Sequence, residues 1–307
     1  MYSLLNDVFI TKVNVSTYGA KMPRADSHFV RNIAVCVCSI EEQKKIADYL
    51  DSKCSQIDLI IEKQKQIIEK LKEYKTSLIT EVVTKGLDPN VEMKDSGVEW
   101  VGKIPLNHTI RKIKHCIQGL TDGTHGTFQR VENGKYLLSA KNVFEKGLLI
   151  GDKESLISEQ DYHEITKNGY PQKGDILLCC VGTVGRCMIY DRDEPIAFQR
   201  SVIFIRCNNK IILPKMMFYC LQTSPVNIQE RLAVNKSAQE GIYQGAVSNI
   251  YIVFPKLITE QESIITYLDD KCSKIEISIE KKEQIIEKLK EYKKSLIYEV
   301  VTGKREV

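Results

Sequence analysis

The sequence contains the same long helical segment twice. Residues 43–84 and 261–302 align with an offset of 218 positions, and 29 of the 42 aligned residues are identical, which chance does not produce. A domain-sized segment separates the two copies, whereas the units of a solenoid follow one another directly. The sequence therefore predicts two equivalent long helices, residues 41–85 and 257–303.

Each copy has an apolar seam with heptad spacing. The seam of the first copy runs from Leu50 to Val82, with polar breaks at Gln64 and Lys75, and the second copy has its breaks at the equivalent places. Heptad spacing of apolar residues is typical of a coiled coil. Since one helix cannot bury such a seam in water, we expect the copies to pack against each other or against another chain.

Further apolar side chains lie beside the seam in both copies. They make the apolar stripe wider than a two-stranded coil requires, so the helices could hold a second partner. A coiled coil that serves only dimerisation is the simpler alternative. The candidate partner-binding residues are Ile60, Ile67, Tyr74, Ile285 and Tyr292.

Composition indicates a folded protein. Of the 307 residues, 43% are hydrophobic and 27% are charged. No apolar run approaches the roughly 20 residues of a membrane-spanning helix, and the opening "MYSLLNDVFITK" lacks the order of a signal peptide, so we expect a cytoplasmic protein without a membrane partner. The net charge of +4 permits an anionic partner, although an ordinary solvated surface explains it equally well.

The ten cysteines mostly lie in apolar runs such as "AVCVC" and "DILLCCVG". None has the paired CxxC spacing of a zinc site. We expect them to be small buried hydrophobic residues, and we predict no metal site.

The central segment, residues 105–256, has the pattern of an α+β domain. The stretches "GKYLLSAKNVF", "GDILLCCVGTVGRCMIY", "IAFQRSVIFIRC" and "NIYIVFP" are typical of strands, and "PKMMFYCLQTSPVNIQERL" is typical of a helix. These stretches predict a mixed sheet with peripheral helices and polar loops.

The duplication extends into the residues that precede each helix. "VRNIAVCVCSIEEQ" stands before the first helix, and "VSNIYIVFPKLITEQ" stands before the second. Residues 1–40 are therefore expected to be the remnant of a first domain, and residues 86–104 the linker that leads to a complete second domain.

This order of motifs resembles the specificity subunit of type I restriction-modification systems. The resemblance rests on the strand, the "EEQ" or "TEQ" entry, "LKEYKxSLIxEVVT" and "GVEWVGKIP", and it covers nearly the whole chain. It implies target recognition domains that alternate with two helical regions packed antiparallel as a spacer. It also implies a subunit that is not itself an enzyme and that directs methyltransferase and endonuclease subunits to a bipartite target in double-stranded DNA.

The resemblance carries further expectations. S-adenosylmethionine, ATP and Mg belong to the partner subunits and not to this chain. Because the first recognition domain is represented by only about 40 residues, the chain resembles a truncated or rearranged allele that reads half of a site, alone or as a homodimer. His108 stands where the family commonly has a tryptophan.

The polar loops of the central segment supply candidate DNA contacts. Arg and Lys can bond guanine, Asn and Gln can bond adenine, and Ser, Thr and Lys can hold phosphates. Each residue taken singly could equally be an ordinary exposed polar side chain. The candidates are Lys112, Thr124, His125, Thr127, Lys141, Asn142, Thr183, Arg186, Gln199, Arg200, Ser201, Lys236 and Gln239.

The sequence contains no motif that predicts catalysis. An adenine-methylation motif is absent, since "DPN" at 88–90 is an inadequate match, and no phosphate-binding loop of the GxxxxGK[ST] type occurs. The alternatives that remain are a coiled-coil protein-interaction module and a rearranged allele that does not bind DNA sequence-specifically. Steep salt dependence of binding would distinguish DNA recognition from the interaction module.

Overall fold

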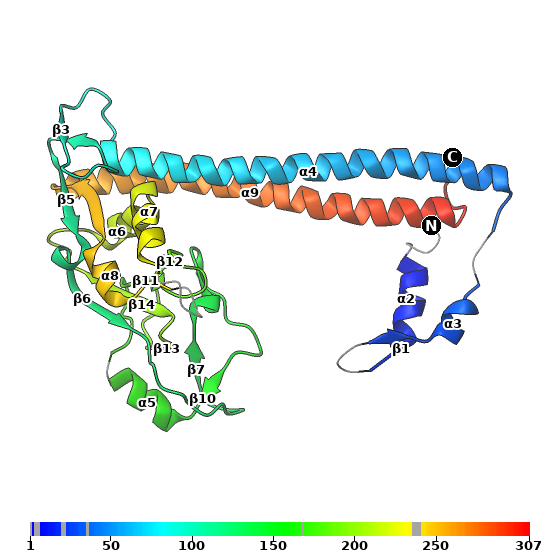
Figure 1. The fold of residues 1–307 in the computed structure, drawn as a ribbon, viewed down its shortest axis with the longest axis horizontal. Helices are drawn as coiled ribbons and strands as arrows, with labels where there is room; N and C mark the ends of the chain where they lie inside the picture. Colours follow the sequence, from blue (N-terminus) through cyan, green and yellow to red (C-terminus); the bar gives the residue numbers. More distant parts are fainter. Residues whose placement is uncertain (1, 3–6, 20–22, 35–36, 168, 235–240) are drawn as a thin grey trace. The chain divides into compact units, whose positions relative to one another are not determined.

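The computed structural model of the chain describes residues 2, 7–19, 23–34, 37–167, 169–234 and 241–307 (Figure 1). It divides into two compact units. Unit 1 comprises residues 1–72 and 274–307, and unit 2 comprises residues 73–273. The division crosses both long helices, α4 (Ile40–Lys85) and α9 (Ile258–Val301). Each unit is described by itself below.

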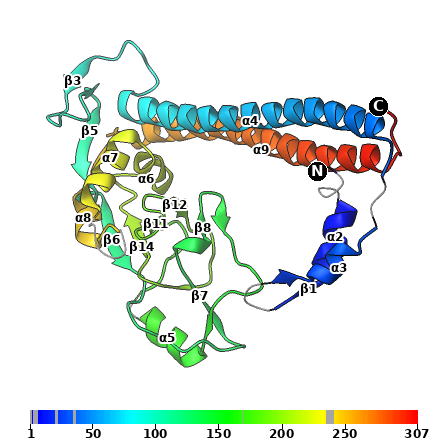
Figure 2. The same ribbon diagram turned by 45° about the vertical axis from the view of Figure 1, so that its right-hand side comes forward.

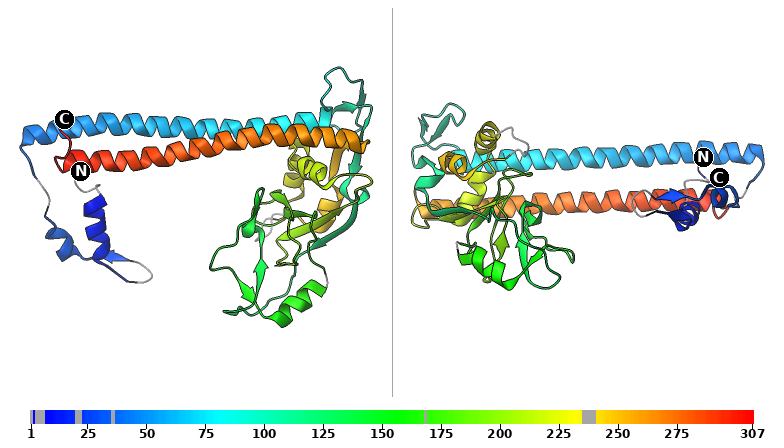
Figure 3. Two further views of the ribbon diagram at one scale, coloured as in Figure 1. Left: turned by 180° about the vertical axis from the view of Figure 1, so that it is seen from behind. Right: turned by 60° about the horizontal axis from the view of Figure 1, so that its bottom comes forward.

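In unit 1 the two long helices pack antiparallel (Figure 3). Lys293 of α9 contacts Asp58 of α4 at 2.6 Å, and Lys282 contacts Gln64 at 3.2 Å, so residue numbers rise in one helix as they fall in the other. This confirms the antiparallel coiled coil that the resemblance implied. The side chains that form the buried seam of this unit are Leu50, Cys54, Ile57, Ile61, Ile68, Ile286, Leu296, Ile297 and Val300.

The packing of unit 1 has a local pseudo-twofold symmetry. Gln64 and Lys282 occupy equivalent positions of the two copies, 218 residues apart, and they bond to each other. Two equivalent positions can meet in an antiparallel pair only where an axis relates one helix to the other. The polar break in the apolar seam therefore lies at that axis and fixes the register of the helices, a known role of single polar residues in coiled coils.

The N-terminal part of unit 1 has few elements. They are α2 (Asp7–Val15), β1 (Thr17–Tyr18), β2 (Arg24–Ala25) and α3 (Ser27–Arg31). Strands β1 and β2 pair antiparallel. The Asp26 carboxylate accepts hydrogen bonds from the N–H groups of His28 and Phe29 and caps α3, which buries none of its side chains. The Tyr2 hydroxyl donates to the Asp51 carboxylate of α4 at 2.6 Å.

Unit 2 holds the β structure and its covering helices. In chain order, after the end of α4, its elements are β3 (Met93–Asp95), β4 (Lys103–Pro105), β5 (His108–Lys112), η1 (Ile113–His115), β6 (Ile117–Asp122), β7 (Lys135–Leu138), η2 (Ala140–Asn142), β8 (Val143–Phe144), β9 (Gly147–Leu148), β10 (Leu156–Ile157), α5 (Glu159–Lys167), β11 (Ile176–Cys179), β12 (Cys187–Ile189), β13 (Ala197–Phe198), β14 (Val202–Cys207), α6 (Pro214–Leu221), α7 (Ser224–Ala233), α8 (Gln244–Asn249) and β15 (Tyr251–Pro255).

Several small sheets make up the β structure of unit 2 (Figure 2). A four-stranded antiparallel sheet has the order β12-β11-β14-β6, and a three-stranded sheet has the order β10-β7-β13 with β7 and β13 parallel. Strand β15 pairs with β5. The α+β class is thus confirmed, and the mixed sheet is the three-stranded one. The main core cluster is formed by Leu138, Ala140, Val143, Leu177, Cys179, Met188, Tyr190, Ile196, Phe198, Val202 and Phe204.

One predicted helix proves to be two. Residues 214–232 were expected to be continuous, but α6 ends at Leu221 and α7 begins at Ser224. Pro225 has no N–H with which to continue the helical hydrogen bonds of α6. Between the two helices, the Thr223 hydroxyl donates to the carbonyl of Cys220 at 2.8 Å. Helices α6 and α7 are therefore separate elements.

Most cysteines are buried, as the apolar runs predicted. Of those in the described part of the chain, only Cys38 is exposed, and Cys36 lies outside it. Burial raises the pKa of the buried Cys116 thiol to about 11, so the group is inert near neutral pH. Among the described residues, no three His, Cys, Asp or Glu side chains gather as metal ligands, and no helix has the length and hydropathy needed to cross a membrane.

In the first turn of each long helix, the side chain of a glutamine donates a hydrogen bond to a backbone carbonyl of the segment before the helix. Gln261 is fully buried, and its amide donates to the carbonyls of Pro255 and Ile211, each at 2.9 Å. The equivalent Gln43 donates to the carbonyl of Cys38 at 2.8 Å. The repeated "EQ" entry thus has a structural role in each copy.

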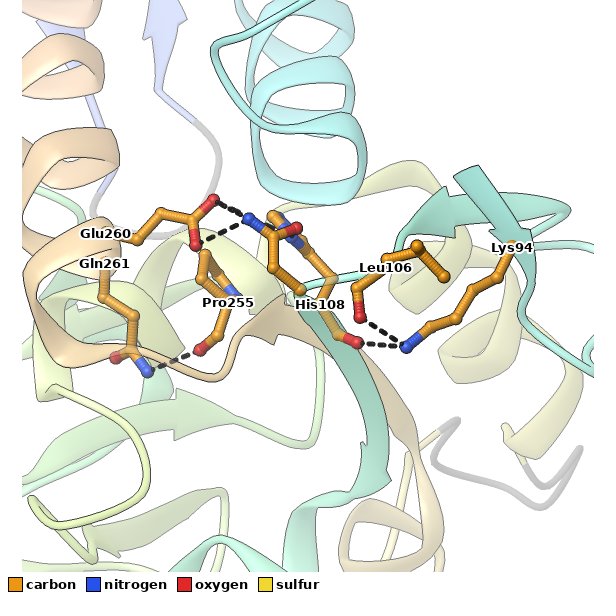
Figure 4. A network of polar contacts seen from close by, with 7 residues as sticks. Lys94, Leu106, His108, Pro255, Glu260 and Gln261 are labelled. Carbon is orange, nitrogen blue, oxygen red and sulfur yellow. Dashed lines mark hydrogen bonds and ion pairs between the residues drawn. The ribbon is translucent and has the colours of Figure 1, made fainter. Parts of the chain in front are cut away.

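A polar network joins the start of α9 to the linker that follows α4 (Figure 4). The Asn107 amide donates to both carboxylate oxygens of Glu260, at 2.8 and 3.0 Å, so its oxygen is left to accept from His108 Nδ1 at 3.1 Å. Lys94 donates to the carbonyls of Leu106 and His108, each at 2.8 Å. These bonds fix the corner at which the β structure of unit 2 meets the helix.

His108 is completely buried in this corner. Its Nε2 has no hydrogen-bond partner among the described residues. Burial, and then the nearby Lys94 charge, lower the pKa of His108 to about 4, even though Glu260 lies 4.0 Å away. The imidazole is therefore neutral at physiological pH and acts as a packing group.

The buried seam predicts unequal effects for two leucines of α4. Replacing fully buried Leu50 by Ala should lower the free energy of unfolding by about 2–5 kcal/mol, because apolar contacts are lost and a cavity is left. Leu59, which is 56% exposed, is the matched control, and Leu59→Ala should change stability by less than about 0.5 kcal/mol. Urea unfolding followed by helical circular dichroism measures both. Equal losses would contradict the seam.

His108 predicts a loss of stability in acid. Because its folded pKa of about 4 lies below the unfolded value, the unfolded chain binds more protons, so stability should fall as pH drops through the range between about 6.5 and 4, by up to about 3 kcal/mol. Urea unfolding at several pH values measures this slope. His108→Gln should flatten it, whereas exposed His163→Gln should leave it unchanged. An unaltered slope in the His108 variant would refute the assignment.

Candidate nucleic-acid interface

Residues 122–130, which begin with the motif "DGTH", form a loop that is joined by its backbone to the turn after β13. The Thr124 N–H donates to the carbonyl of Phe198 at 2.8 Å, and the Arg200 N–H donates back to the carbonyl of Thr124 at 3.0 Å. Thr124 also forms an isolated parallel bridge with Gln199. Two segments far apart in sequence are thereby held side by side.

Gly123 permits this close approach. A Cβ at this position would lie 2.3 Å from the carbonyl oxygen of Gln199, which no side chain could occupy. Its N–H donates to the carbonyl of Val202 at 3.0 Å. The glycine of the "DGTH" motif therefore brings the loop onto the turn, as expected where one backbone lies directly against another.

The side chains on top of this junction are polar and open to solvent. His125 is exposed, and its Nε2 lies 2.6 Å from the Asp122 carboxylate, which orients the ring. The Thr124 hydroxyl accepts from the Gly126 N–H at 3.2 Å and shapes the loop. Thr127 is exposed. Neither His125 nor Thr127 is used to hold the domain core together.

Arg200 is the most available cation at the junction. Its side chain is exposed and bonds to no other described residue. Gln199 beside it is half buried, and its N–H donates to the carbonyl of Leu138 at 2.8 Å. The backbone of Arg200 is held in place, while the N–H donors of its guanidinium remain available. Such a group can bind a phosphate or the edge of a guanine base.

The loop carries one further cation, which is not among the predicted DNA contacts. Arg130 is exposed, and no ion pair or hydrogen bond of its side chain occurs within the described part of the chain. It directly follows the "DGTHGTFQ" stretch, so its proximity to the motif was a signal that could have identified it.

A cavity of about 260 Å³ lies beneath the loop. Its apolar side includes Ile165, Phe198 and Phe204, while Asp122 and His125 bound it on the polar side. The two phenylalanine rings meet edge to face, with 5.6 Å between their centroids. The loop thus borders a cavity that is partly lined by aromatic side chains.

The structure contradicts the prediction that Asn142 contacts DNA. Asn142 is 1% exposed. Its amide oxygen accepts from the Ser139 N–H, and its amide nitrogen donates to the carbonyl of Leu149, both at 3.0 Å. Because the amide is buried and bonded within its own loop, it has no edge to present to an adenine, and its role is structural.

Arg186 and Ser201 likewise serve the fold. The Arg186 guanidinium donates to the carbonyl of Ala140 and lies over the ring of Phe144, with 4.5 Å to the centroid. The Ser201 hydroxyl accepts from the Ala140 N–H at 3.0 Å. Both side chains therefore hold η2 in place, and the half-buried Arg186 guanidinium is engaged within the domain, while its predicted DNA contact stays a prediction.

The remaining candidates are dispersed. Lys141 pairs with Glu154 at 2.9 Å and keeps 61% of its side chain exposed, and the Lys141 hydrogen bond is the main reason that the pKa of Glu154 is lowered. Lys112 lies over the Tyr251 ring, with 5.2 Å to the centroid. Thr183 is exposed in the turn between β11 and β12. Lys236 and Gln239 lie outside the described residues.

The candidate partner-binding residues are all exposed. In unit 1, Ile60 is 44% exposed, Ile67 38%, Ile285 42% and Tyr292 49%, and in unit 2 Tyr74 is 57% exposed. Their seam neighbours are buried, so each helix shows a second apolar strip that the coiled coil itself does not cover. Exposed apolar strips of this kind are typical of protein interaction surfaces.

Comparisons with known proteins agree with this arrangement. Over 299 residues the chain is 29% identical to the type I restriction enzyme MjaVIII specificity subunit of Methanocaldococcus jannaschii, covering 94% of this chain and 66% of that protein. It is 23% identical over 270 residues to the type I restriction enzyme EcoBI specificity subunit of Escherichia coli, covering 84% of this chain and 55% of that protein. The chain thus spans less than two thirds of each relative.

A solved structure has the same fold. It comes from work on complex assembly and conformational transition of the type I R-M system, and it superposes with a TM-score of 0.68 at 15% sequence identity, covering 98% of this chain and 69% of that chain. Residues 127–289, more than half of the sequence, match the family described as "Type I restriction modification DNA specificity domain". The chain belongs to this family, as its helical motifs suggested.

Proposed function

We propose that the recognition domain, residues 105–256, binds double-stranded DNA sequence-specifically and reads one half of a bipartite target. The observation that carries this proposal is the junction of the 122–130 loop with the turn at Arg200. It holds Arg200 against Thr124, and the exposed side chains of His125, Thr127 and Arg130 belong to the same loop. A backbone-anchored surface of this kind can hold a fixed register on a duplex.

The two long helices would act as a spacer. Helix α4 has 46 residues, so it is roughly 69 Å long, about two turns of B-form DNA. A rod of this length would separate one recognition domain from whatever reads the second half of the site. The pseudo-twofold relation of Gln64 and Lys282 fits a target whose halves lie on opposite sides of an axis.

Partner subunits would perform the chemistry. The exposed strip of Ile60, Ile67, Tyr74, Ile285 and Tyr292 is the surface that would bind methyltransferase subunits, and an endonuclease subunit would complete the complex. S-adenosylmethionine, ATP and Mg would be bound by those partners. This chain would then act as a non-catalytic subunit that selects the DNA sequence.

The second half of the target requires a second reader. A homodimer of this chain would read an inverted repeat, whereas pairing with another specificity polypeptide would give an asymmetric bipartite site. Mass measurement of the chain with and without its methyltransferase separates these states from a single copy that reads one half-site.

Sequencing of methylated adenines in cells that carry this chain with its methyltransferase tests the proposal. A methylated motif that appears with the chain and disappears on its deletion supports sequence-specific recognition, and the motif also gives the spacer and the symmetry. Absence of any motif, with salt-insensitive binding to protein partners, would favour the rival coiled-coil interaction module, because phosphate contacts weaken steeply with salt.

Arg200→Ala provides a residue-level prediction. Removing its guanidinium should weaken binding to a duplex that carries the motif found by methylation sequencing by about 1–3 kcal/mol. If Arg200 reads guanine, the preference at one base should relax. If it holds a phosphate, the affinity for every sequence should fall equally. The matched control is Arg192→Ala, since Arg192 already pairs with Glu194 at 3.8 Å. Fluorescence anisotropy at fixed salt measures both variants, and equal affinities for the Arg200 variant and the unmodified chain would exclude Arg200 from the interface.

A further inference from the structure

Helix α7 carries a carboxyl group that the proposed interface does not use. Glu230 is 3% exposed, and its Oε1 has no hydrogen-bond partner among the described residues. Burial alone raises the pKa of Glu230 to about 7. A buried carboxyl group without a partner is costly to the fold when it is ionised, so its position requires an explanation.

Glu230 lies directly against the turn between β11 and β12. Gly185 in this turn has φ +87°, and a Cβ there would lie 2.4 Å from Glu230 Oε2. The carboxyl group therefore packs on the bare backbone of the turn, and only glycine leaves room for it. The turn, residues 182–185, carries exposed Thr183, one of the candidate DNA contacts.

The other side of the turn is also fixed. Val181 forms an antiparallel bridge with Gly241, and the Ile242 N–H donates to the carbonyl of Cys180 at 2.8 Å. These backbone bonds hold the root of the turn. Within the turn, the Gly185 N–H donates to the carbonyl of Cys179 at 3.1 Å, and the side of the turn that faces α7 contacts the Glu230 carboxyl group.

Within residues 73–234 and 241–273, as far as the structure describes them, no cation bonds to Glu230. Arg186 follows the turn, but its guanidinium is bonded to Ala140 and covers Phe144. Arg231, the neighbour of Glu230 on α7, is exposed.

A described titratable group near Glu230 is a buried thiol. Burial, and then the charges of Glu145 and Glu230, raise the pKa of Cys187 well above its ordinary value, while Lys75, which bonds to Glu145 at 2.6 Å, acts in the opposite direction. For Glu230 itself, burial is the cause that favours the neutral carboxyl group.

We propose that Glu230 is a positioning residue whose neutral carboxyl group holds the turn 182–185 against α7, and whose ionisation loosens that turn. The neutral group fits the dry contact with the glycine backbone. The charged group must gain water or a donor, and the movable element beside it is the turn. The consequence for DNA binding rests on the proposed function, because it requires that Thr183 approaches the duplex.

Hydrogen–deuterium exchange of the full chain tests the positioning role without DNA. After correction for the intrinsic exchange rate, protection of the turn should fall about tenfold between about pH 6 and about pH 8.5, because the group changes from mostly protonated to mostly ionised. Glu230→Gln cannot ionise and should keep protection within about twofold over the same range. Exposed Glu164→Gln on α5 is the matched control and should behave as the unmodified chain does.

Two results would overturn the proposal. One is protection of the turn that does not change with pH in the unmodified chain, and the other is a Glu230→Gln variant with the same pH dependence as that chain. Gly185→Ala approaches the same contact from the turn and is available if Glu230→Gln does not fold. It should expose the turn at every pH, since its Cβ displaces the carboxyl group.

A second measurement separates this proposal from the proposed function. The affinity for a duplex with the methylated motif, relative to a scrambled duplex, should fall about tenfold over the same pH range, and Glu230→Gln should abolish this fall. A pH-dependent turn without any change in this affinity ratio would retain the positioning of the turn by Glu230 and remove the turn from the DNA interface.

Discussion

Burial of one repeated apolar seam is the constraint on which the structure depends. Each long helix has the same heptad pattern, and neither can keep its seam in water. Because the two copies have similar sequences, each helix of an antiparallel pair presents an equivalent apolar surface to the other. The polar break in that surface lies where Gln64 bonds to Lys282. This contact and the Lys293–Asp58 pair define the register of the two helices in unit 1.

The recognition domain uses backbone contacts to present side chains. The loop at Gly123 and the turn at Arg200 are joined through main-chain hydrogen bonds, so the side chains above them remain free. Asn142, Arg186 and Ser201 show the opposite arrangement, since their polar side chains bond to backbone groups of the domain. Polar residues of the same types thus have two roles. Some stabilise the backbone of the domain, and others remain exposed on its loops.

Buried ionisable groups stand at both borders of the recognition domain. His108 lies at the corner where the linker meets α9, and burial keeps it neutral. Glu230 lies beneath a turn of the candidate interface, and burial brings its pKa close to neutral pH. The physical cause is the same, removal of a charge from water. The outcomes differ because the first group is locked by Asn107, while the second supports an element that can move.

The sequence by itself determined the two helices, their seam and the family to which the chain belongs. Periodicity and repetition are local properties, so Leu50 and Leu296 could be placed in the seam without coordinates. Burial of most cysteines was predictable for the same reason. Only the tertiary structure decided which polar residues are available: Arg186 and Arg200 look alike in sequence, yet one guanidinium lies over Phe144 and the other is exposed. The direction of a side chain depends on contacts between distant segments, and spacing along the chain does not contain that information.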